Sequence, residues 1–506
     1  MRRLNVYKGL FLAIVLISCK KMDHGQTQVT DGTIQKKDSA TGSIIVYQTA
    51  EDASKKMYRE LNLTFNTNPA SSIEITVDPN TLYQHIQGVG MALTGSAAYT
   101  VKQLPTDNRT ALLTDIFGDS GMKMNMLRVT IGASDYSTTE YTYDDQTGTN
   151  TDNDLSDFAL KGDDLNYVIP VLQEIKTIKQ ANPNLYVMGS PWSAPAWMKK
   201  NNLLKQAVAA ATDSANNQLK YGYYLTWANY LTKYVEAMAA SPNNITINAI
   251  TPQNEPRTSS NEYITMFMDP QWQKVLVRDY LRQKLDEAGL TSTKIFVGDN
   301  NWSGSSYQSA IYADATARSK VQGAAFHGYA GEPAVMTNIR NLDTDKEVHM
   351  TEWTSRRDYT WANDLDNMAS KYMIQPFRNW AKSVMYWNLA LDEVSEPNVR
   401  AGTNYSRPVV TINKTTKAIT KNVDYYVLSH VSKFIQPGLT RRMSSTDISA
   451  NQNIDNVAFL NTDGWKTVLL VNKNTTAKTV DIKVQGTTNK FTYTIPARSV
   501  MTFNWN

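Results

Sequence analysis

The sequence predicts an α/β protein, a (β/α)8 TIM barrel with an appended β-sandwich that is built from strands at both chain ends. From Ile86 onward, short apolar runs of strand type alternate with segments of helical periodicity, which is the pattern of repeated β-α units around a parallel sheet. The runs cover residues 86–93, 125–132, 185–192, 245–252, 294–299, 323–329, 347–353 and 382–389. They number eight, as a closed α/β barrel requires.

Helices are expected between these runs, where apolar residues recur at spacings of three and four. Segment 163–180 is a clear case, with apolar side chains at positions 165, 168, 169, 172, 175 and 178. Segments 221–240 and 271–288 have the same periodicity, and Gly289 is a typical helix stop. The segment after the sixth run has the weakest helical pattern.

Beyond about Lys433 the pattern becomes all-β. Strands are predicted at 457–460, 467–471, 479–484 and 490–495, with Asn, Thr, Asp and Gly in the turns between them. Two earlier strands, 43–47 and 72–77, have no local partner, and Asp78-Pro79-Asn80 is expected to end the second. We therefore expect residues 44–85 and 434–506 to form one β-sandwich, with the barrel at 86–433.

The N-terminus has the features of an export signal. Arg2, Arg3 and Lys8 precede an apolar stretch that is too short to span a bilayer as a helix. The following Leu-Ile-Ser-Cys resembles a bacterial lipobox, and Cys19 is the only cysteine, so no disulfide within the chain is possible. We expect a lipoprotein signal peptide at 1–19, lipidation of Cys19 and a polar tether at 20–43. This predicts a secreted bacterial lipoprotein at the outer membrane, cell surface or periplasmic face.

Charge and composition exclude some kinds of partner. The 506 residues include 51 basic and 47 acidic ones, interspersed, for a net charge of +4, so no nucleic-acid partner is expected. The five histidines show no close ligand spacing, and neither a metal nor another cofactor is predicted. An acidic loop could attract calcium, but its ligands have no regular register and the interpretation is a solvated loop. That loop contains Asp144, Asp145, Asp152, Asn153 and Asp154.

Two glutamates lie at the ends of strand-like runs. Glu255 follows the fourth run and Glu352 ends the seventh, and barrel enzymes carry their working groups at the carboxyl ends of strands. Cleavage of a glycosidic bond with retention needs one protonated and one ionised carboxyl, about 5 to 5.5 Å apart. The pair therefore predicts a sugar-cleaving enzyme, in which the acid occupies a drier or more negative setting than the nucleophile.

Several motifs occur in an order that is specific to one family. They are 87–94 (QGVGMALT), 127–137 (LRVTIGASDYS), 189–199 (GSPWSAPAWMK), 254–256 (NEP), 327–329 (HGY), 351–353 (TEW), 386–392 (YWNLALD) and 496–500 (PARSV). Together they resemble glycoside hydrolase family 30, the family of glucosylceramidases and β-1,6-glucanases. The resemblance extends from about Val46 to Trp505.

The resemblance implies roles for particular residues. Glu255 corresponds to the general acid/base and Glu352 to the nucleophile, with Arg128 beneath the nucleophile. Asn254 resembles the residue that hydrogen-bonds the sugar 2-hydroxyl, although a turn-forming Asn is the alternative.

Further positions resemble sugar-binding residues of the family. Asp135 and Trp192 correspond to ligands of the outer hydroxyls, and Trp387 to a subsite wall, although core tryptophans and a helix-capping Asp are the alternatives. Tyr329 resembles a tyrosine that contacts the nucleophile, whereas His327 is as consistent with a scaffold histidine.

The favoured interpretation is a glucan endo-1,6-β-glucosidase that acts by double displacement. A glucosylceramidase or exo-acting β-glucosidase and a β-xylosidase or xylanase remain open. By the resemblance, the xylanases of the family select a glucuronic acid branch with basic residues on a late loop, and Arg400 and Arg407 keep that activity open. A transglycosylase and a non-catalytic glycan-binding lipoprotein also remain open.

Overall fold

The computed structural model describes residues 42–66, 71–181, 184–208, 214–400 and 404–506. The predicted signal peptide, the lipobox with Cys19 and all but the end of the predicted tether lie outside the described residues. In the part of the chain that is described, no helix combines the length and apolar character needed to cross a membrane.

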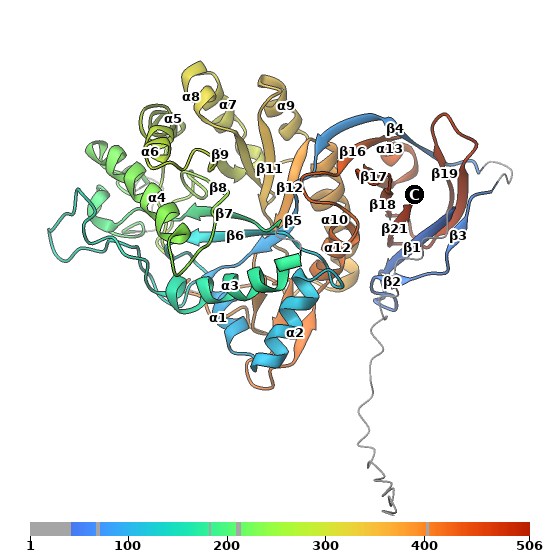
Figure 1. The fold of residues 1–506 in the computed structure, drawn as a ribbon, viewed down its shortest axis with the longest axis horizontal. Helices are drawn as coiled ribbons and strands as arrows, with labels where there is room; N and C mark the ends of the chain where they lie inside the picture. The colour runs from blue at the N-terminus through green and yellow to red at the C-terminus, as the bar shows by residue number, and fades with distance from the viewer. Residues whose placement is uncertain (1–41, 67–70, 182–183, 209–213, 401–403) are drawn as a thin grey trace, which may run out of the picture. The chain divides into compact units, whose positions relative to one another are not determined.

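Eight parallel strands close into a barrel, which confirms the predicted fold class (Figure 1). They are β5 (Gly88–Ala92), β6 (Met126–Ile131), β7 (Tyr186–Pro191), β8 (Ala249–Ile250), β9 (Lys294–Asn301), β10 (Gly323–His327), β11 (Glu347–Glu352) and β12 (Ala381–Tyr386). Nearly every residue of these strands is buried, because helices cover the outside of the barrel and side chains fill its interior. Each of the eight predicted runs overlaps one barrel strand, although β9 continues past its run to Asn301 and β12 begins one residue before its run.

Helices connect the barrel strands, and a further helix follows β12 before the sandwich. They are α1 (Gly95–Lys102), α2 (Thr106–Phe117), α3 (Ile169–Ile178), α4 (Tyr224–Ala239), α5 (Pro270–Leu276), α6 (Arg282–Glu287), α7 (Ser306–Tyr312), α8 (Ala315–Lys320), α9 (Val335–Leu342), α10 (Trp361–Ala369), α11 (Gln375–Arg378) and α12 (Val423–Ser432). Side chains of Thr94, Asp269 and Thr360 cap α1, α5 and α10 by accepting hydrogen bonds from first-turn amides. The predicted helix 271–288 is present, but a π-helical turn, Val277–Leu281, separates α5 from α6.

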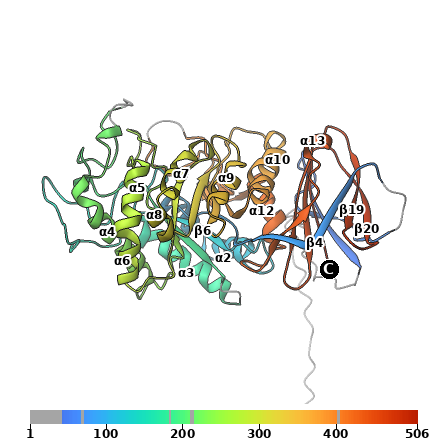
Figure 2. The same ribbon diagram turned by 90° about the horizontal axis from the view of Figure 1, so that it is seen from above.

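Strands from both chain ends form the sandwich, as predicted. They are β1 (Ser43–Ala50), β2 (Tyr58–Arg59), β3 (Leu63–Thr64), β4 (Glu74–His85), β16 (Arg441–Ser445), β17 (Ile454–Leu460), β18 (Lys466–Asn472), β19 (Lys478–Val484), β20 (Lys490–Ile495) and β21 (Ser499–Trp505). Strand β1 pairs with β21, and β4 lies between β16 and β19 (Figure 1). Figure 2 shows β4, β19 and β20 of this sheet from above. The remaining elements are α13 (Ser449–Gln452) and the small sheet of β13 (Ala390–Leu391), β14 (Val410–Ile412) and β15 (Ile419–Lys421).

The expected end of the second early strand is wrong. Strand β4 continues past Asp78 to His85, and its register against β16 shifts there. The carboxylate of Asp78 accepts hydrogen bonds from the backbone of Asn80 and the hydroxyl of Thr81. The turn residues therefore make a local irregularity within the strand, after which the ladder resumes.

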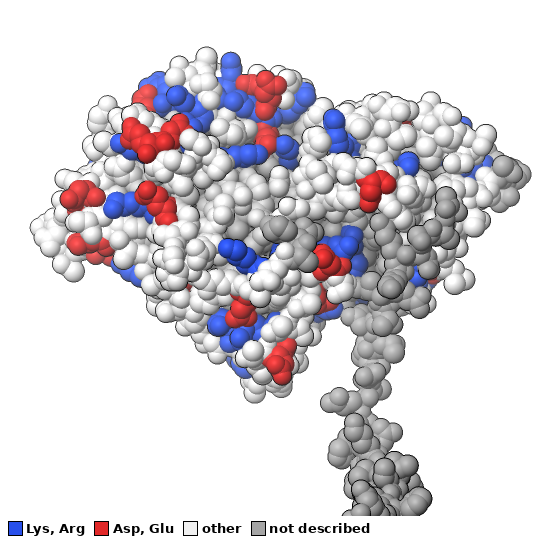
Figure 3. Space-filling view, in the orientation of Figure 1, with Lys and Arg blue, Asp and Glu red and all other residues white. Residues whose placement is uncertain are grey.

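In a sandwich strand that contacts the barrel, successive side chains point into two different hydrophobic cores. In β17, Val457 and Phe459 join the core that includes the barrel helices, whereas Ala458 joins the core of the sandwich. Successive strand residues face opposite sides of a sheet, so one strand contributes to both cores. Figure 3 shows acidic and basic groups close together on the visible face of the molecule.

Candidate active site

A cavity of about 640 Å³ contains both predicted catalytic glutamates. Glu255 lies in the loop after β8, and Glu352 is the last residue of β11. The cavity lining comprises Asp135, Tyr136, Glu255, Thr258, Tyr263, Asn301, Tyr329, Glu352, Trp353, Thr354, Ser355, Arg356, Tyr359, Trp387, Arg400, Asn404, Tyr405 and Ser406. The cavity thus combines carboxyl groups with aromatic rings, which suits binding of a sugar.

The two glutamates are close enough for retention. One carboxylate oxygen of Glu255, one of Glu352 and a ring nitrogen of His327 all lie within 4.8 Å of one another. Inverting enzymes separate their carboxyls by about 6.5 to 9.5 Å so that a water molecule fits between nucleophile and sugar. The two carboxylate oxygens approach more closely than that range, which fits direct attack by one carboxylate on the sugar.

Donors surround the carboxylate of Glu352. Arg128 Nη1 on β6 donates to Glu352 Oε2 at 2.6 Å, and the Tyr329 hydroxyl donates to Oε1 at 2.8 Å. Arg128 also donates through Nη2 to Asn254 Oδ1 at 2.6 Å. The guanidinium therefore links the residue before the predicted acid/base to the predicted nucleophile, and two donors fix the Glu352 side chain in one orientation.

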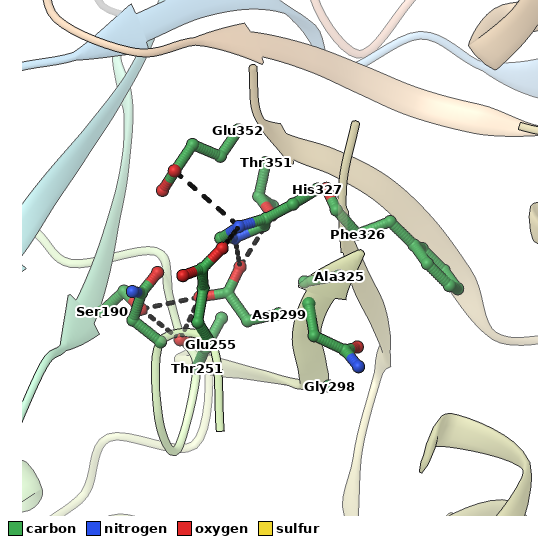
Figure 4. A network of polar contacts seen from close by, with 12 residues as sticks. Ser190, Thr251, Glu255, Gly298, Asp299, Ala325, Phe326, His327, Thr351 and Glu352 are labelled. Carbon is green, nitrogen blue, oxygen red and sulfur yellow. Dashed lines mark hydrogen bonds and ion pairs between the residues drawn. The ribbon is translucent and has the colours of Figure 1, made fainter. Parts of the chain in front are cut away.

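Glu255 is held in an unusual backbone conformation. Its φ is +41°, in the left-handed region that residues other than glycine seldom adopt. Its backbone N–H donates to the carbonyl of Asp299 at 2.9 Å, and its carbonyl accepts from Thr258 N at 2.7 Å. Such strain persists where surrounding contacts impose it, and at active sites it re-aims a side chain. Here the carboxyl of Glu255 faces His327 and lies near that of Glu352 (Figure 4).

The pKa values of the two glutamates differ in the opposite sense to that expected: the pKa of Glu255 is lowered and that of Glu352 is raised. Burial raises the pKa of Glu255, but the hydrogen bond and positive charge of His327 outweigh burial, so the net shift is downward. Burial raises the pKa of Glu352, and the cations His327 and Arg128 offset it only in part. Glu255 is also the less buried of the two, with 20% of its side chain exposed against 8% for Glu352.

A buried aspartate that the sequence motifs did not single out lies behind the two glutamates. Asp299 Oδ2 accepts from Arg128 Nη2 at 2.8 Å, and Oδ1 is 3.0 Å from His327 Nε2 (Figure 4). Burial raises the pKa of Asp299, but the charges of Arg128 and His327 lower it strongly, and it remains ionised. Three hydroxyl groups complete its hydrogen bonds, those of Ser190, Thr251 and Thr351.

His327 is part of this charge network and is fully buried behind the cavity. Burial lowers the pKa of its imidazole, but the charges of Glu352 and Asp299 outweigh burial and raise the pKa to about 10. The imidazolium faces Glu255 through Nδ1 at 3.2 Å and Asp299 through Nε2 at 3.0 Å. One residue thus contacts the predicted acid/base and the buried aspartate at the same time.

Four further predicted residues divide between the cavity wall and a layer behind it. Asp135, Tyr329 and Trp387 line the cavity, and burial followed by the Glu352 charge raises the pKa of Asp135 to about 7. Trp192 is 3% exposed and stacks on Trp387 with ring centroids 5.4 Å apart. Trp192 therefore supports a wall residue, and its direct contact with a sugar stays a prediction.

The two arginines considered for a charged sugar branch have different surroundings. Arg400 lines the cavity and pairs with Glu262 at 3.0 Å, whereas Arg407 does not line it. Arg407 is buried and forms ion pairs with Asp364 and Asp424, both at 2.7 Å. Arg407 is therefore a structural residue and is not available to select an acidic branch.

The fold and the two facing glutamates define a class, the barrel glycoside hydrolases. The chain belongs to glycosyl hydrolase family 30, because the model of its TIM-barrel domain matches residues 86–435 and that of its beta-sandwich domain residues 440–503. The protein is therefore an enzyme that hydrolyses glycosidic bonds.

Relatives within the family include β-1,6-glucanases. An endo-1,6-β-D-glucanase of Trichoderma harzianum is 33% identical over 403 residues, which cover 77% of this chain and 78% of that protein. The putative glucosylceramidase 4 of Caenorhabditis elegans is 29% identical over 462 residues, which cover 86% of this chain and 83% of that protein. The solved structure of the endo-β1,6-glucanase BT3312 has 32% sequence identity and a TM-score of 0.80. The match covers 92% of this chain and 99% of that one.

Proposed function

We propose that this enzyme is a β-1,6-glucanase that cleaves its substrate with retention, with Glu352 as nucleophile and Glu255 as general acid/base. The observation that carries the mechanism is the approach of their carboxylate oxygens to within 4.8 Å across one cavity. The choice of β-1,6-glucan is supported by relatives named as endo-1,6-β-glucanases at 32 to 33% identity.

In the first step, protonated Glu255 gives its proton to the glycosidic oxygen while Glu352 attacks the anomeric carbon. The bond to the leaving sugar breaks, and a covalent glycosyl-enzyme forms on Glu352. In the second step Glu255 takes a proton from a water molecule while the water oxygen attacks the anomeric carbon. The bond between that carbon and the Glu352 carboxylate breaks, which releases the sugar and restores both glutamates. Arg128 and Tyr329 orient the Glu352 carboxylate throughout.

The order of the two glutamate pKa values has to reverse when substrate binds. The two carboxyls titrate as a pair, so a proton that Glu352 loses is available to Glu255. A sugar hydroxyl that donates to Glu352 stabilises its ionised form and lowers its pKa. The glycosidic oxygen meanwhile shields Glu255 from water, which favours its protonated form.

A substrate panel tests the assignment. Purified enzyme is incubated with pustulan, laminarin, xylan and glucosylceramide, and reducing sugar or released ceramide is measured. We expect pustulan, a β-1,6-glucan, to be cleaved fastest, and Glu352→Gln to abolish that activity at unchanged thermal stability. Faster cleavage of another substrate would reassign the specificity, and turnover by Glu352→Gln would overturn the assigned nucleophile.

Glucosylceramide is the second candidate substrate, because a relative of 29% identity is named a putative glucosylceramidase. A non-catalytic glycan-binding role is disfavoured by the site itself. A binder has no need for two glutamates in reactive proximity or for the buried charges of Arg128 and Asp299 beneath them.

We also propose that the protein is secreted and anchored by a lipid on Cys19. The proposal is supported by the basic residues, apolar stretch and lipobox-like sequence at the N-terminus. Labelled palmitate fed to expressing cells should enter the wild-type protein and not Cys19→Ser, and only the wild type should fractionate with membranes. Equal labelling of both proteins would contradict the proposal.

A further inference from the structure

Three acidic side chains gather in the long loop between β6 and α3, outside the cavity described above. Carboxylate oxygens of Asp144, Asp152 and Asp157 all lie within 4.8 Å of one another. Asp144 and Asp152 are buried, with 1% and 7% of their surface exposed, whereas Asp157 is exposed. The sequence did not indicate this group, because Asp157 lies outside the acidic loop that was considered for calcium and Asp144 is eight residues away from Asp152.

The grouped charges have no cationic partner among the described residues. Lys161, the nearby lysine of the loop, pairs with Asp145 at 2.9 Å instead. One oxygen of Asp144, Oδ2, is buried and accepts no hydrogen bond from any described residue. A buried carboxylate without a partner is costly, and proteins normally compensate such a charge with a cation or a metal ion.

The remaining contacts hold the three carboxylates in place without neutralising them. Gln146 Nε2 donates to Asp144 Oδ1 at 2.7 Å and to Asp157 Oδ2 at 3.1 Å. Ser156 Oγ donates to Asp152 Oδ1 at 3.1 Å, and Asp157 N donates to Asp152 Oδ2 at 2.7 Å.

We propose that Asp144, Asp152 and Asp157 bind a calcium ion. Oxygen ligands from carboxylates select a hard cation, and no His or Cys belongs to the group. Calcium accepts six to eight ligands in irregular geometry, which suits carboxylates supplied by one loop, whereas magnesium demands a near-ideal octahedron. The amide of Gln146 supplies a fourth oxygen if it rotates by 180°, since an amide nitrogen and oxygen exchange places in that rotation.

The ion would stabilise a loop that adjoins the active site. Trp197 Nε1 donates to the carbonyl of Asp144 at 2.8 Å, which ties the loop to the segment after β7. The hydroxyl of Tyr143, next to Asp144, accepts from Gly132 N at 2.7 Å, close to the cavity residue Asp135. The ion is thus a structural one, separate from the proton-transfer chemistry of the glutamates.

Calcium binding is measured on the full-length protein after chelator treatment and dialysis. Titration calorimetry with CaCl2 should give about one site per chain, and adding Ca2+ should raise the Tm by at least about 2 °C over the chelated protein. MgCl2 at the same concentration should bind more weakly. Absence of calcium binding at millimolar concentration, or preferential binding of Mg2+, would overturn the proposal.

Variants locate the site. Asp157→Asn, at an exposed position, and Asp152→Asn should each lower calcium affinity at least tenfold and remove most of the Tm rise. Asp145→Asn is the matched control, because it removes the same charge from the same loop outside the group, and its calcium affinity should stay within about threefold of wild type. Equal affinities for wild type and both site variants would place any bound calcium elsewhere and refute the assignment.

Discussion

At the scale of single residues, the active site is a network of buried carboxylates paired with two buried cations. The carboxylates of Glu352 and Asp299 both pair with Arg128, at 2.6 and 2.8 Å. His327 supplies a second cation between Asp299 and Glu255. Removing one member of such a network leaves another charge buried without a partner, so substitutions here should affect both function and stability.

Replacing Glu255 should slow substrates with a poor leaving group much more than substrates with a good one, whereas replacing Glu352 should stop turnover of both. Glu352→Ala should lose essentially all turnover, because no other group forms the covalent intermediate. Glu255→Ala should keep rapid glycosylation of the enzyme by an aryl β-glucoside with an acidic phenol, which departs without a proton. Its rate on pustulan should fall by about 10² to 10⁴-fold.

Burst kinetics with the aryl glucoside and steady-state rates with pustulan check this difference. Added azide should attack the trapped intermediate of Glu255→Ala and give a β-glucosyl azide. Equal loss on activated and natural substrates, with no burst, would argue against Glu255 as the acid/base.

Asp299 should act as a positioning residue. In Asp299→Asn the neutral amide no longer balances Arg128 and His327, so the Glu352 carboxylate loses its fixed orientation. We expect kcat to fall by about 10²-fold with a smaller change in KM. The alkaline limb of the pH profile should move to higher pH, because His327 without Asp299 loses its proton nearer to the ordinary imidazole pKa and then no longer lowers the pKa of Glu255.

The exposed Asp345→Asn serves as the control for charge removal, and its profile should match that of the wild type. A uniform loss of activity in Asp299→Asn, with an unchanged pH profile, would indicate a purely structural role.

At the scale of secondary-structure elements, periodicity predicted the architecture well. The eight apolar runs each overlap a barrel strand, because parallel strands are buried on both faces and form continuous apolar segments in the sequence. Helix 271–288 was predicted as continuous, yet Val277–Leu281 is a π-helical turn. An apolar pattern at spacings of three and four does not distinguish such a turn from an α-helix.

The site was predictable in part. Strand-end position pointed to Glu255 and Glu352, and the same rule applied to Asp299, the last residue of the fifth predicted run, would have found it. Cavity residues such as Tyr263 and Tyr405 lie in loops without periodicity, so nothing in their local sequence marks them. The pKa order of the glutamates depends on which cations face each one, and that information exists only in three dimensions.

At the scale of the whole molecule, the barrel and the sandwich share buried polar contacts. His430 of α12 lies between two sandwich residues, with Nε2 2.8 Å from Thr49 Oγ1 and Nδ1 2.9 Å from Thr502 Oγ1. Ser370, after α10, donates to the carboxylate of Asp455 on β17. These contacts join β1, near one end of the described chain, and β21, at the other, to helices of the barrel.

This interface should weaken in acid. Burial lowers the pKa of His430 from 6.5 to about 3. Between these values the unfolded chain binds a proton that the folded chain does not, so the stability is complete above pH 6.5 and declines as the pH falls toward 3. His430→Gln should therefore be less stable than wild type at pH 7 but lose less Tm between pH 7 and pH 4.5.

Differential scanning calorimetry at the two pH values measures both losses, with His85→Gln as a control on the more exposed histidine of β4. If His430→Gln and the wild type lost the same number of degrees, protonation of His430 would not be a source of acid instability.

The stereochemistry of the first product tests the central claim most directly. Proton NMR during the first minutes of cleavage of a β-1,6-linked glucan separates α- and β-anomeric signals before mutarotation mixes them. Two successive displacements at the anomeric carbon, with Glu352 as the first nucleophile, predict that the β-anomer accumulates first. Initial release of the α-anomer would mean a single displacement by water and would contradict the covalent mechanism.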